Sequence, residues 1–240
     1  MTFELCIPAR NEAPTIVEAL RLLSAALPQS LEWSIVVVEN GSTDGTAETI
    51  EREHLPHVRV LRISEAGKGR AVRYAASQSS ADIFAYMDAD LSVDPSEIPA
   101  LLAQLSEGVD IVAGSRLMTS SRVDRTPLRS LSSVLFSLVA RRWLSVPVRD
   151  TQCGCKFMNR RGREILASGK EDGWFFDLEF LARASQAGLI ILEHPIRWTE
   201  TRFLGRKSQL NMLTDSFRGF QAIWRIRERL KENAAIGSES

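Results

Sequence analysis

An apolar run that stops abruptly at two carboxylates restricts the folds open to this chain. Residues 83–87 read Ile-Phe-Ala-Tyr-Met, and Asp88, Ala89 and Asp90 follow directly. A short run without a polar position predicts a strand that is buried on both faces of a sheet. Since α/β folds bind ligands at the carboxyl ends of their strands, we expect Asp88 and Asp90 at that edge. Short Asp-x-Asp patterns also occur in solvated turns, so the motif alone leaves both interpretations open.

The first half of the chain repeats this alternation of apolar runs and helical segments. We predict further buried strands at residues 5–7, 33–38, 58–63 and 109–113. Helices are predicted at residues 11–27, 71–79 and 94–105, with another that begins near residue 46. Alternating strands and helices favour right-handed βαβ units and a mostly parallel sheet. The predicted fold class is therefore α/β.

Composition and charge indicate which kinds of molecule this protein can bind. At 240 residues and 44% hydrophobic content, the chain is long enough for one substantial core. The formal net charge of +0 indicates no overall preference for nucleic acid, and we expect no nucleic-acid partner. The charge is unevenly placed, because residues 116–163 hold eleven Lys and Arg against only Asp124 and Asp150. That stretch predicts a basic surface for anionic lipid or a phosphorylated substrate, with solvated arginines as the alternative.

Cysteine use and the N-terminus bear on the compartment. Cys6, Cys153 and Cys155 are too few for a disulfide framework, which fits a reducing compartment. The apolar stretch at residues 3–8 has no basic segment before it, which predicts no secretory signal peptide. Residues 131–148 are interrupted by two arginines and fall short of the roughly 18 apolar residues of a spanning helix. We therefore expect a cytoplasmic protein, soluble or peripheral to a membrane.

Two loops that follow predicted strands carry groups suited to phosphate. Residues 39–46 read Glu-Asn-Gly-Ser-Thr-Asp-Gly-Thr and lead into a helix. Gly67, Lys68 and Gly69 precede the next helix, where backbone N–H groups and an ammonium can approach phosphate with help from the helix dipole. A plain turn is the alternative for this second loop. Together with the acidic pair, these loops suit a nucleotide diphosphate, because carboxylates and substrate phosphates commonly hold Mg²⁺ or Mn²⁺ between them.

Two apolar helices with arginines are predicted in the second half, at residues 127–146 and 209–230. The second has an apolar stripe at three- and four-residue spacing, made of Leu210, Leu213, Phe217, Phe220 and Trp224. Its other face holds Arg218, Arg225 and Arg229. Aromatic and basic residues together are typical of an interfacial membrane helix, whereas an apolar stripe alone more often packs on a core. We favour the membrane surface because two such helices occur in the same half.

Acidic residues lie among apolar and aromatic ones between these two helices. Asp150 begins the sequence Asp-Thr-Gln-Cys-Gly-Cys-Lys-Phe, and Asp177 follows Gly173, Trp174 and two phenylalanines. Desolvation in such surroundings tunes a carboxylate for acid–base chemistry, and capping of a helix is the alternative.

Seven motifs occur in an order that resembles the family 2 glycosyltransferases. They are Pro8-Ala-Arg10-Asn11-Glu12, Glu39-Asn-Gly-Ser-Thr-Asp44-Gly-Thr, Gly67-Lys68-Gly69, Asp88-Ala-Asp90, Gly114-Ser-Arg116, Asp150-Thr-Gln-Cys-Gly and Phe176-Asp177-Leu-Glu179. The resemblance covers nearly the whole chain and is greatest to the dolichyl-phosphate glucosyltransferase and dolichyl-phosphate mannose synthase branch. It implies a GT-A fold, in which a Rossmann-like, mostly parallel sheet is flanked by helices and C-terminal amphipathic helices meet the membrane interface. It also implies an inverting, metal-dependent transfer of a hexose from a nucleotide diphosphate sugar to a polyprenyl phosphate.

The resemblance implies roles for residues by matching position. The residues that would hold the nucleotide are Pro8, Arg10, Glu12, Glu39 and Lys68. Asp88 would contact both donor and metal, and Asp90 would bind the metal, Mg²⁺ or Mn²⁺. The residues that would handle the pyrophosphate and the acceptor phosphate are Arg116, Arg129 and Lys156. Asp177 is the candidate base if the acceptor is a sugar hydroxyl, whereas a phosphate monoester with a second pKa of about 6 needs no strong base.

Three positions differ from the usual pattern of that family. Glu39-Asn40 stands where relatives commonly have two aspartates, and Ser92 stands where mannose synthases often have a glutamine after the acidic pair. Residues 205–208 read Gly-Arg-Lys-Ser and only approximate the family's glycine, serine and lysine loop.

Three functions follow as hypotheses. The first is hexose transfer to dolichyl or another polyprenyl phosphate by a protein peripheral to the cytoplasmic membrane face, with UDP-glucose preferred over GDP-mannose as donor. The second is transfer to a sugar hydroxyl with Asp177 as base, and the third is nucleotide-sugar binding without catalysis. The predicted catalytic domain spans residues 1–208, with a nucleotide-sugar-binding half at 1–116 and an acceptor half at 117–208. Residues 209–240 are predicted to form an amphipathic helix and tail.

Overall fold

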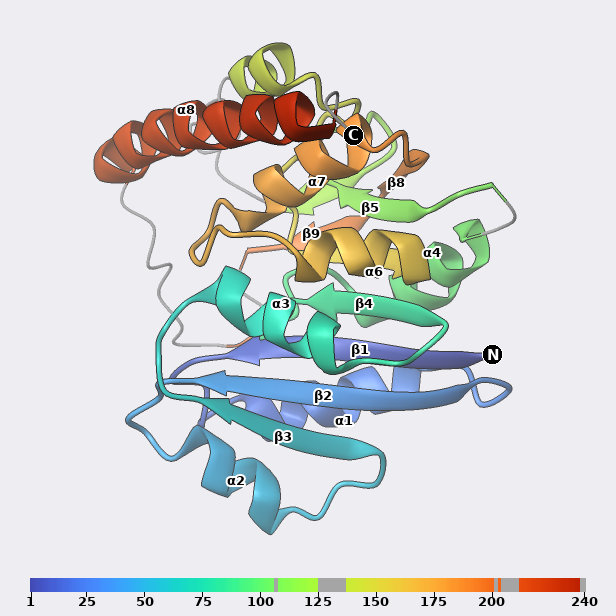
Figure 1. The fold of residues 1–240 in the computed structure, drawn as a ribbon. Helices are drawn as coiled ribbons and strands as arrows, with labels where there is room; N and C mark the ends of the chain where they lie inside the picture. The colour runs from blue at the N-terminus through green and yellow to red at the C-terminus, as the bar shows by residue number, and fades with distance from the viewer. Residues whose placement is uncertain (106–107, 125–136, 201–202, 204–211, 238–240) are drawn as a thin grey trace.

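A seven-stranded sheet runs through the molecule in a computed structural model that describes residues 1–105, 108–124, 137–200, 203 and 212–237 (Figure 1). From one edge to the other its strands are β3 (Val58–Ile63), β2 (Glu32–Asn40), β1 (Thr2–Ala9), β4 (Ile83–Met87), β7 (Cys155–Asn159), β5 (Ile111–Ser115) and β8 (Ile191–Pro195). A separate two-stranded sheet pairs β6 (Arg122–Asp124) with β9 (Arg197–Thr199). The strands predicted in the first half of the chain are all present, and the α/β class is confirmed.

Parallel pairing brings the ends of the first strands to one edge. β1 pairs in parallel with β2 on one side and β4 on the other, with Ala9 opposite Glu39 and Cys6 opposite Tyr86. β2 pairs in the same way with β3. Because parallel strands end on the same side, the loops after β1, β2, β3 and β4 gather at the carboxyl edge of the sheet, on the left in Figure 1.

The antiparallel strand β7 was not predicted from the sequence. It lies between β4 and β5, and its first residue, Cys155, pairs with Met87 at the end of β4. Lys156, the second residue of this strand, interrupts the apolar pattern that would have marked a buried strand. Since β7 runs the opposite way, the loop before it, at residues 150–154, reaches the carboxyl edge beside the acidic pair.

Helices cover both faces of the sheet (Figure 1). One face packs against α1 (Ile16–Ala26), α2 (Thr46–Arg52), the 3₁₀ turn η1 (Pro95–Glu97) and α4 (Ile98–Gln104). The other packs against α3 (Lys68–Gln78), residues 137–144, α6 (Arg160–Ala167), α7 (Phe176–Gln186) and α8 (Met212–Gly237). Along β1, Leu5 and Ile7 belong to the first core and Cys6 to the second, because successive side chains of a strand point to opposite faces. All three are fully buried, which explains the continuous apolar run.

Two predicted helix boundaries are wrong for local reasons. The first helix was predicted from Asn11 but begins at Ile16, because Asn11 has a left-handed φ of 56° that a right-handed helix does not contain. The helix predicted at residues 71–79 begins earlier, at Lys68, directly after Gly67. Lys68 is therefore part of the first turn of α3, where helix N–H groups point toward the site.

The C-terminal helix α8 packs on the core as well as facing solvent. Ile223 and Ile226 are fully buried in the second core, whereas Trp224 is 61% exposed. On the basic face of the predicted interfacial helix, Arg225 and Arg229 both form ion pairs with Glu171. The remaining side chains of the predicted apolar stripe lie outside those that the structure describes.

The other predicted interface helix, at residues 127–146, is described only from residue 137, and residues 137–144 are helical. Among the helices in the described part of the chain, none is both long and apolar enough to cross a membrane. The division of the chain at residues 116 and 208 stays a prediction.

Candidate functional site

The acidic pair lies in a tight turn at the end of β4. The backbone N–H of Asp88 donates to the carbonyl of Gly154 at 3.1 Å, and that of Leu91 donates back to the carbonyl of Asp88 at 3.1 Å. Leu91 has a left-handed φ of 50°, an uncommon conformation for a bulky residue, and its fully buried side chain holds it there. The Ser92 N–H donates to Asp90 Oδ1 at 3.0 Å. The turn therefore fixes both carboxylates at the carboxyl edge, as predicted.

Lys68 is the nearest cation to this pair among the ion pairs described. Its Nζ lies 2.6 Å from Asp88 Oδ1, with the lysine side chain 11% exposed and the aspartate side chain 32% exposed. Burial opposes the charged form of Lys68, but the nearby carboxylates of Asp88, Asp177 and Asp90 outweigh it and raise the Lys68 pKa. Lys68 is thus an ammonium at neutral pH, placed at a helix N-terminus where anions bind.

Gly154 permits the close approach of Asp88, a role that sequence reasoning missed. A Cβ at Gly154 would lie 2.0 Å from Asp88 Oδ2 and 2.4 Å from its Cγ. Real Cβ atoms do not come this close to other atoms, so any side chain at Gly154 displaces the carboxylate. The signal was present in the motif Asp150-Thr-Gln-Cys-Gly, but only the antiparallel pairing of β7 with β4 shows what the glycine faces.

The glycines beside Lys68 also meet protein atoms. A Cβ at Gly67 would lie 2.7 Å from the carbonyl oxygen of Asp172, and one at Gly69 would lie 2.4 Å from that of Glu171. The sequence predicted that these glycines let the backbone approach phosphate. In the structure they let α3 approach the loop between α6 and α7.

Asn40 joins three loops of the site. Its Nδ2 donates to the Ala9 carbonyl at 2.9 Å, and its Oδ1 accepts from the Gly67 N–H at 3.2 Å. An aspartate, which relatives commonly have here, cannot donate to the carbonyl of Ala9. Asparagine in place of aspartate at position 40 therefore has a structural role, since its amide side chain holds together the ends of β1 and β2 and the loop before α3.

The predicted nucleotide residues lie around the ends of β1 and β2. Glu12 and Glu39 are 7% and 8% exposed, whereas Arg10 is exposed and Pro8 is half-buried. Glu39 Oε1 accepts from the Ser42 N–H, which closes the loop after β2. These residues are close in the fold because β1 and β2 pair through Ala9 and Glu39. Their contacts with a nucleotide stay a prediction.

Arg116 is held by a fork of hydrogen bonds at the end of β5. Its Nε and one terminal nitrogen lie 2.7 Å and 2.8 Å from the two Asp150 oxygens, and its backbone N–H donates to Oδ2 at 2.9 Å. Burial opposes ionisation of both groups, but their mutual attraction outweighs it, raising the Arg116 pKa and lowering the Asp150 pKa. The guanidinium also lies 5.8 Å from the centre of the Trp198 ring. Arg116 is therefore a rigidly oriented cation.

Lys156 and Asp177 form a buried pair beneath the site. Lys156 is fully buried, and its Nζ donates to Asp177 Oδ1 at 2.5 Å and to the Cys153 carbonyl at 2.6 Å. The Tyr86 hydroxyl donates to the same Asp177 oxygen, and burial together with the Asp177 charge raises the Tyr86 pKa. Asp177 is 1% exposed. Neither Lys156 nor Asp177 reaches the surface in this arrangement. The predicted role of Lys156 at the phosphates, and that of Asp177 as base for a sugar hydroxyl, stay predictions.

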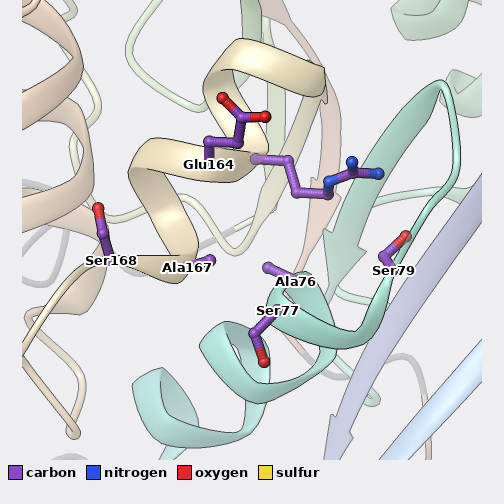
Figure 2. Close-up of a pocket in the computed structure, with 7 residues that line it drawn as sticks. Ala76, Ser77, Ser79, Glu164, Ala167 and Ser168 are labelled. Atoms are coloured by element: carbon purple, nitrogen blue, oxygen red, sulfur yellow. The ribbon is translucent and has the colours of Figure 1, made fainter.

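Two hollows lie away from the acidic pair. One of about 430 Å³ lies between the C-terminal end of α3 and α6, where Ser77, Ser79, Glu164 and Ser168 line it (Figure 2). The other, of about 370 Å³, is lined by residues 143–145 and by side chains of α7 and α8. Neither is lined by the residues predicted for donor binding. Arg129 and the loop at residues 205–208 lie outside the described residues.

The chemistry of the acidic pair fits a hard divalent cation. Both side chains offer carboxylate oxygens, the ligands that Mg²⁺ and Mn²⁺ prefer. Within the described residues, no three His, Cys, Asp or Glu side chains come together as a metal cage. A cation at this edge would therefore draw further ligands from water and substrate phosphates, which is how Mg²⁺ is usually bound.

Comparison with known proteins agrees with this geometry. The family model for glycosyl transferase family 2 matches residues 4–165. Glycosyltransferase AglD of Haloferax volcanii is 32% identical over 200 residues, which cover 80% of this chain and 32% of that protein. Dolichyl-phosphate beta-glucosyltransferase ALG5C of Trichomonas vaginalis is 28% identical over 211 residues, which cover 81% of this chain and 63% of that protein. The chain thus spans less than two thirds of the length of either relative.

A solved structure shares the fold. Glucosyl-3-phosphoglycerate synthase from Mycobacterium tuberculosis, in complex with Mn²⁺ and UDP-glucose, superposes with a TM-score of 0.70 at 21% identity, covering 94% of this chain and 78% of that one. This likeness identifies the GT-A fold predicted from the motifs. Because the family model extends over more than half of the chain and includes the turn that carries Asp88 and Asp90, the chain belongs to glycosyl transferase family 2, a family of glycosyltransferases.

Proposed function

We propose that this chain transfers a hexose, with inversion, from a nucleotide diphosphate sugar to a polyprenyl phosphate at a membrane surface. Family membership and the relative named dolichyl-phosphate beta-glucosyltransferase support this function. The solved relative with bound Mn²⁺ and UDP-glucose supports a metal-dependent reaction, and UDP-glucose is the preferred donor.

The observation that carries the proposal is the contact between Lys68 and Asp88 beside Asp90. One ammonium and two carboxylates meet at a helix N-terminus on the carboxyl edge of the sheet. Asp88 and Asp90 would hold Mg²⁺ or Mn²⁺, which when bound neutralises the charge that develops on the leaving nucleoside diphosphate. Lys68 would bind a donor phosphate oxygen, exchanging part of its contact with Asp88 for the phosphate.

The nucleoside would lie over the ends of β1 and β2. Glu12 and Glu39 are buried acceptors there, and Arg10 is exposed beside them. Asn40 fixes the distance between this region and the loop that carries Lys68, because its side chain bonds to both. The nucleoside and phosphate positions are thus held as one unit.

The acceptor phosphate would meet Arg116. Asp150 orients the guanidinium from behind through two hydrogen bonds, so that Arg116 offers a fixed direction for an anion. Arg129 is proposed as its partner. Lys156 would act from beneath the site, where its charge is balanced by Asp177.

A phosphate acceptor suits the burial of Asp177. This carboxylate is 1% exposed, and one of its oxygens already accepts hydrogen bonds from Lys156 and Tyr86. A base that deprotonates a sugar hydroxyl must reach that hydroxyl, whereas an ionised phosphate attacks without one. The same burial makes Asp177 a positioning residue for Lys156.

The membrane contact is proposed at the exposed apolar side chains of the second half. Leu138 and Trp143 on residues 137–144 are 60% and 49% exposed, and Trp224 on α8 is 61% exposed. Such side chains beside arginines are typical of a surface that lies in the lipid interface. We place the protein at the cytoplasmic face of a membrane, as a peripheral enzyme.

The test is a screen of UDP- and GDP-hexoses against a short polyprenyl phosphate with Mg²⁺ or Mn²⁺, with the product detected by mass. We expect a polyprenyl-phosphate hexose from the wild type and a loss of at least about 10²-fold in Asp90→Ala, since positioned charge stabilisation contributes on that scale. A soluble sugar as the only working acceptor, or Asp90→Ala with near-normal transfer, would contradict the proposal.

A further inference from the structure

The loop between α6 and α7 contacts both α8 and the first turn of α3, which carries Lys68. Glu171 and Asp172, which we name the bridge segment, contact α8 and α3 respectively. Glu171 is 6% exposed, so its carboxylate is removed from solvent. A buried carboxylate is costly unless cations and hydrogen-bond donors satisfy it, and the partners of Glu171 come from α8.

Two arginines one helical turn apart hold the Glu171 carboxylate. Arg225 places two nitrogens 3.1 Å and 2.8 Å from its two oxygens, and Arg229 places one nitrogen 2.9 Å from Oε1. The backbone N–H of Glu171 donates to Glu179 Oε2 at 2.6 Å, which fixes the segment to α7. Since residues at i and i+4 lie on the same side of a helix, both guanidinium groups come from one face of α8.

Asp172 carries the connection onward to α3. Its two oxygens lie 2.7 Å from an Arg70 nitrogen and 2.6 Å from an Arg73 nitrogen. Its carbonyl accepts from the Arg70 backbone N–H at 3.1 Å. Gly67 leaves room for this contact, because a Cβ there would lie 2.7 Å from the same carbonyl oxygen. The bridge segment is therefore bonded to the first turn of α3.

Lys68 lies between these contact points. It follows Gly67, precedes Arg70 by two residues, and contacts Asp88 at 2.6 Å. The same loop adds Trp174, whose ring centre lies 5.1 Å from the Lys68 ammonium. Ion pairs thus join α8 to Glu171 and join Asp172 to Arg70 and Arg73. The backbone of the first turn of α3 and the Trp174 ring connect this network to Lys68, the lysine proposed to bind the donor.

We propose that Glu171 is a positioning residue for Lys68. Through Glu171, α8 would hold residues 67–70, at the start of α3, in the conformation that binds the donor. The inference rests on the proposed function for the identity of the ligand that Lys68 meets. It predicts that docking of α8 and binding of a nucleoside diphosphate favour each other, because coupling between two sites is reciprocal. The interfacial helix would then act on the donor site as well as on the membrane.

The experiment compares Glu171→Gln with Glu228→Gln. Glutamine keeps the shape of the side chain and removes the charge, and the partners Arg225 and Arg229, which are 45% and 33% exposed, can be solvated. Glu228 is the matched control, because it forms a 2.7 Å ion pair with Lys231 on the surface of the same helix. Binding of UDP and GDP with Mn²⁺ is measured by calorimetry, and amide hydrogen exchange is measured with and without nucleotide.

In Glu171→Gln, we expect the Kd of the better nucleotide to rise at least about fivefold, the lower end of usual coupling. In the transfer assay, the donor KM should rise while kcat stays nearly constant. Without ligand, amides at residues 67–74 should exchange faster in Glu171→Gln, and nucleotide should slow exchange at residues 222–232 in the wild type alone. Glu228→Gln should match the wild type throughout.

Two outcomes separate this inference from the proposed function. If the wild type binds nucleotide and Glu171→Gln shows the same Kd and the same exchange at residues 67–74, with only a lower Tm, Glu171 is merely structural and the inference is wrong. If the wild type binds neither nucleotide, the proposed donor site fails, and the positioning role fails with it.

Discussion

Replacing Gly154 with alanine should disable the site while leaving the fold largely intact. The new Cβ would lie 2.0 Å from Asp88 Oδ2, whereas ordinary contacts begin at 3.4 Å, so the carboxylate must move by about 1.4 Å. Asp88 has little freedom to do so, because its backbone N–H is bonded to the Gly154 carbonyl and its Oδ1 to Lys68. A misplacement of about 1 Å at a reacting centre costs on the order of 10²-fold in rate.

The expected result is a fall of at least about 10²-fold in kcat/KM, equivalent to about 2.7 kcal/mol of transition-state stabilisation. Added volume at a packed position destabilises by about 1–3 kcal/mol, so the Tm should fall by only several degrees. Transfer is measured with the donor found in the screen, together with thermal unfolding. Gly173→Ala is the control, because a Cβ there would meet nothing within 4 Å.

If Gly154→Ala is folded at the assay temperature and keeps nearly the wild-type kcat/KM, the proposed clash with Asp88 does not control activity. Such a result would mean that the Asp88 carboxylate can leave its position without loss of function. Equal losses in Gly154→Ala and Gly173→Ala would instead point to backbone effects of alanine in these loops. Only a loss confined to Gly154→Ala agrees with a clash between the new Cβ and the Asp88 carboxylate.

Four further predictions concern other contacts. Asp177→Asn leaves the buried charge of Lys156 uncompensated, so we expect the unfolding free energy to fall by about 3–5 kcal/mol. The kcat per folded molecule should fall by less than about 10²-fold, and a larger fall in kcat would favour a base role. Asn40→Asp removes the donor to the Ala9 carbonyl and should lower unfolding free energy by about 1–3 kcal/mol and weaken UDP binding in calorimetry. Trp224→Ser should reduce sedimentation with anionic vesicles at unchanged Tm, and unchanged sedimentation would contradict the membrane contact. The Asp150 pKa is lowered in the folded state, so ionised Asp150 stabilises the fold above the unfolded pKa of 3.8, and this stabilisation is lost as the pH falls below 3.8. In Asp150→Asn, the unfolding free energy should therefore decrease less steeply as the pH is lowered through this range.

Local sequence patterns correctly predicted the strands of the first half of the chain and the position of the acidic pair. The run that ends at Asp88 predicted a buried strand and its edge position, and the structure has both. The mostly parallel sheet also followed from the alternation of strands and helices, because helical crossovers join parallel strands. The sequence placed Lys68 and the acidic pair after successive strands, but their contact at 2.6 Å was seen only in the structure.

Local patterns failed where distant segments pair. β7 carries the buried Lys156, whose ammonium donates to Asp177 and to the Cys153 carbonyl. The partners of Gly154 and Glu171 lie far away in the chain, at Asp88 and on α8. No local pattern marks such pairs, since what selects them is the free energy of packing and charge burial in the complete fold.

The sequence by itself determined the α/β class, the place of the carboxylates at a strand end and the kind of chemistry they suit, because hydrophobic periodicity and side-chain type are local properties. The tertiary structure decided which groups support them. It buried Asp177 and Lys156, placed Gly154 against Asp88, and paired Arg225 of α8 with Glu171. Those placements depend on one antiparallel strand and one packed helix, and their register is set by contacts between residues far apart in the chain.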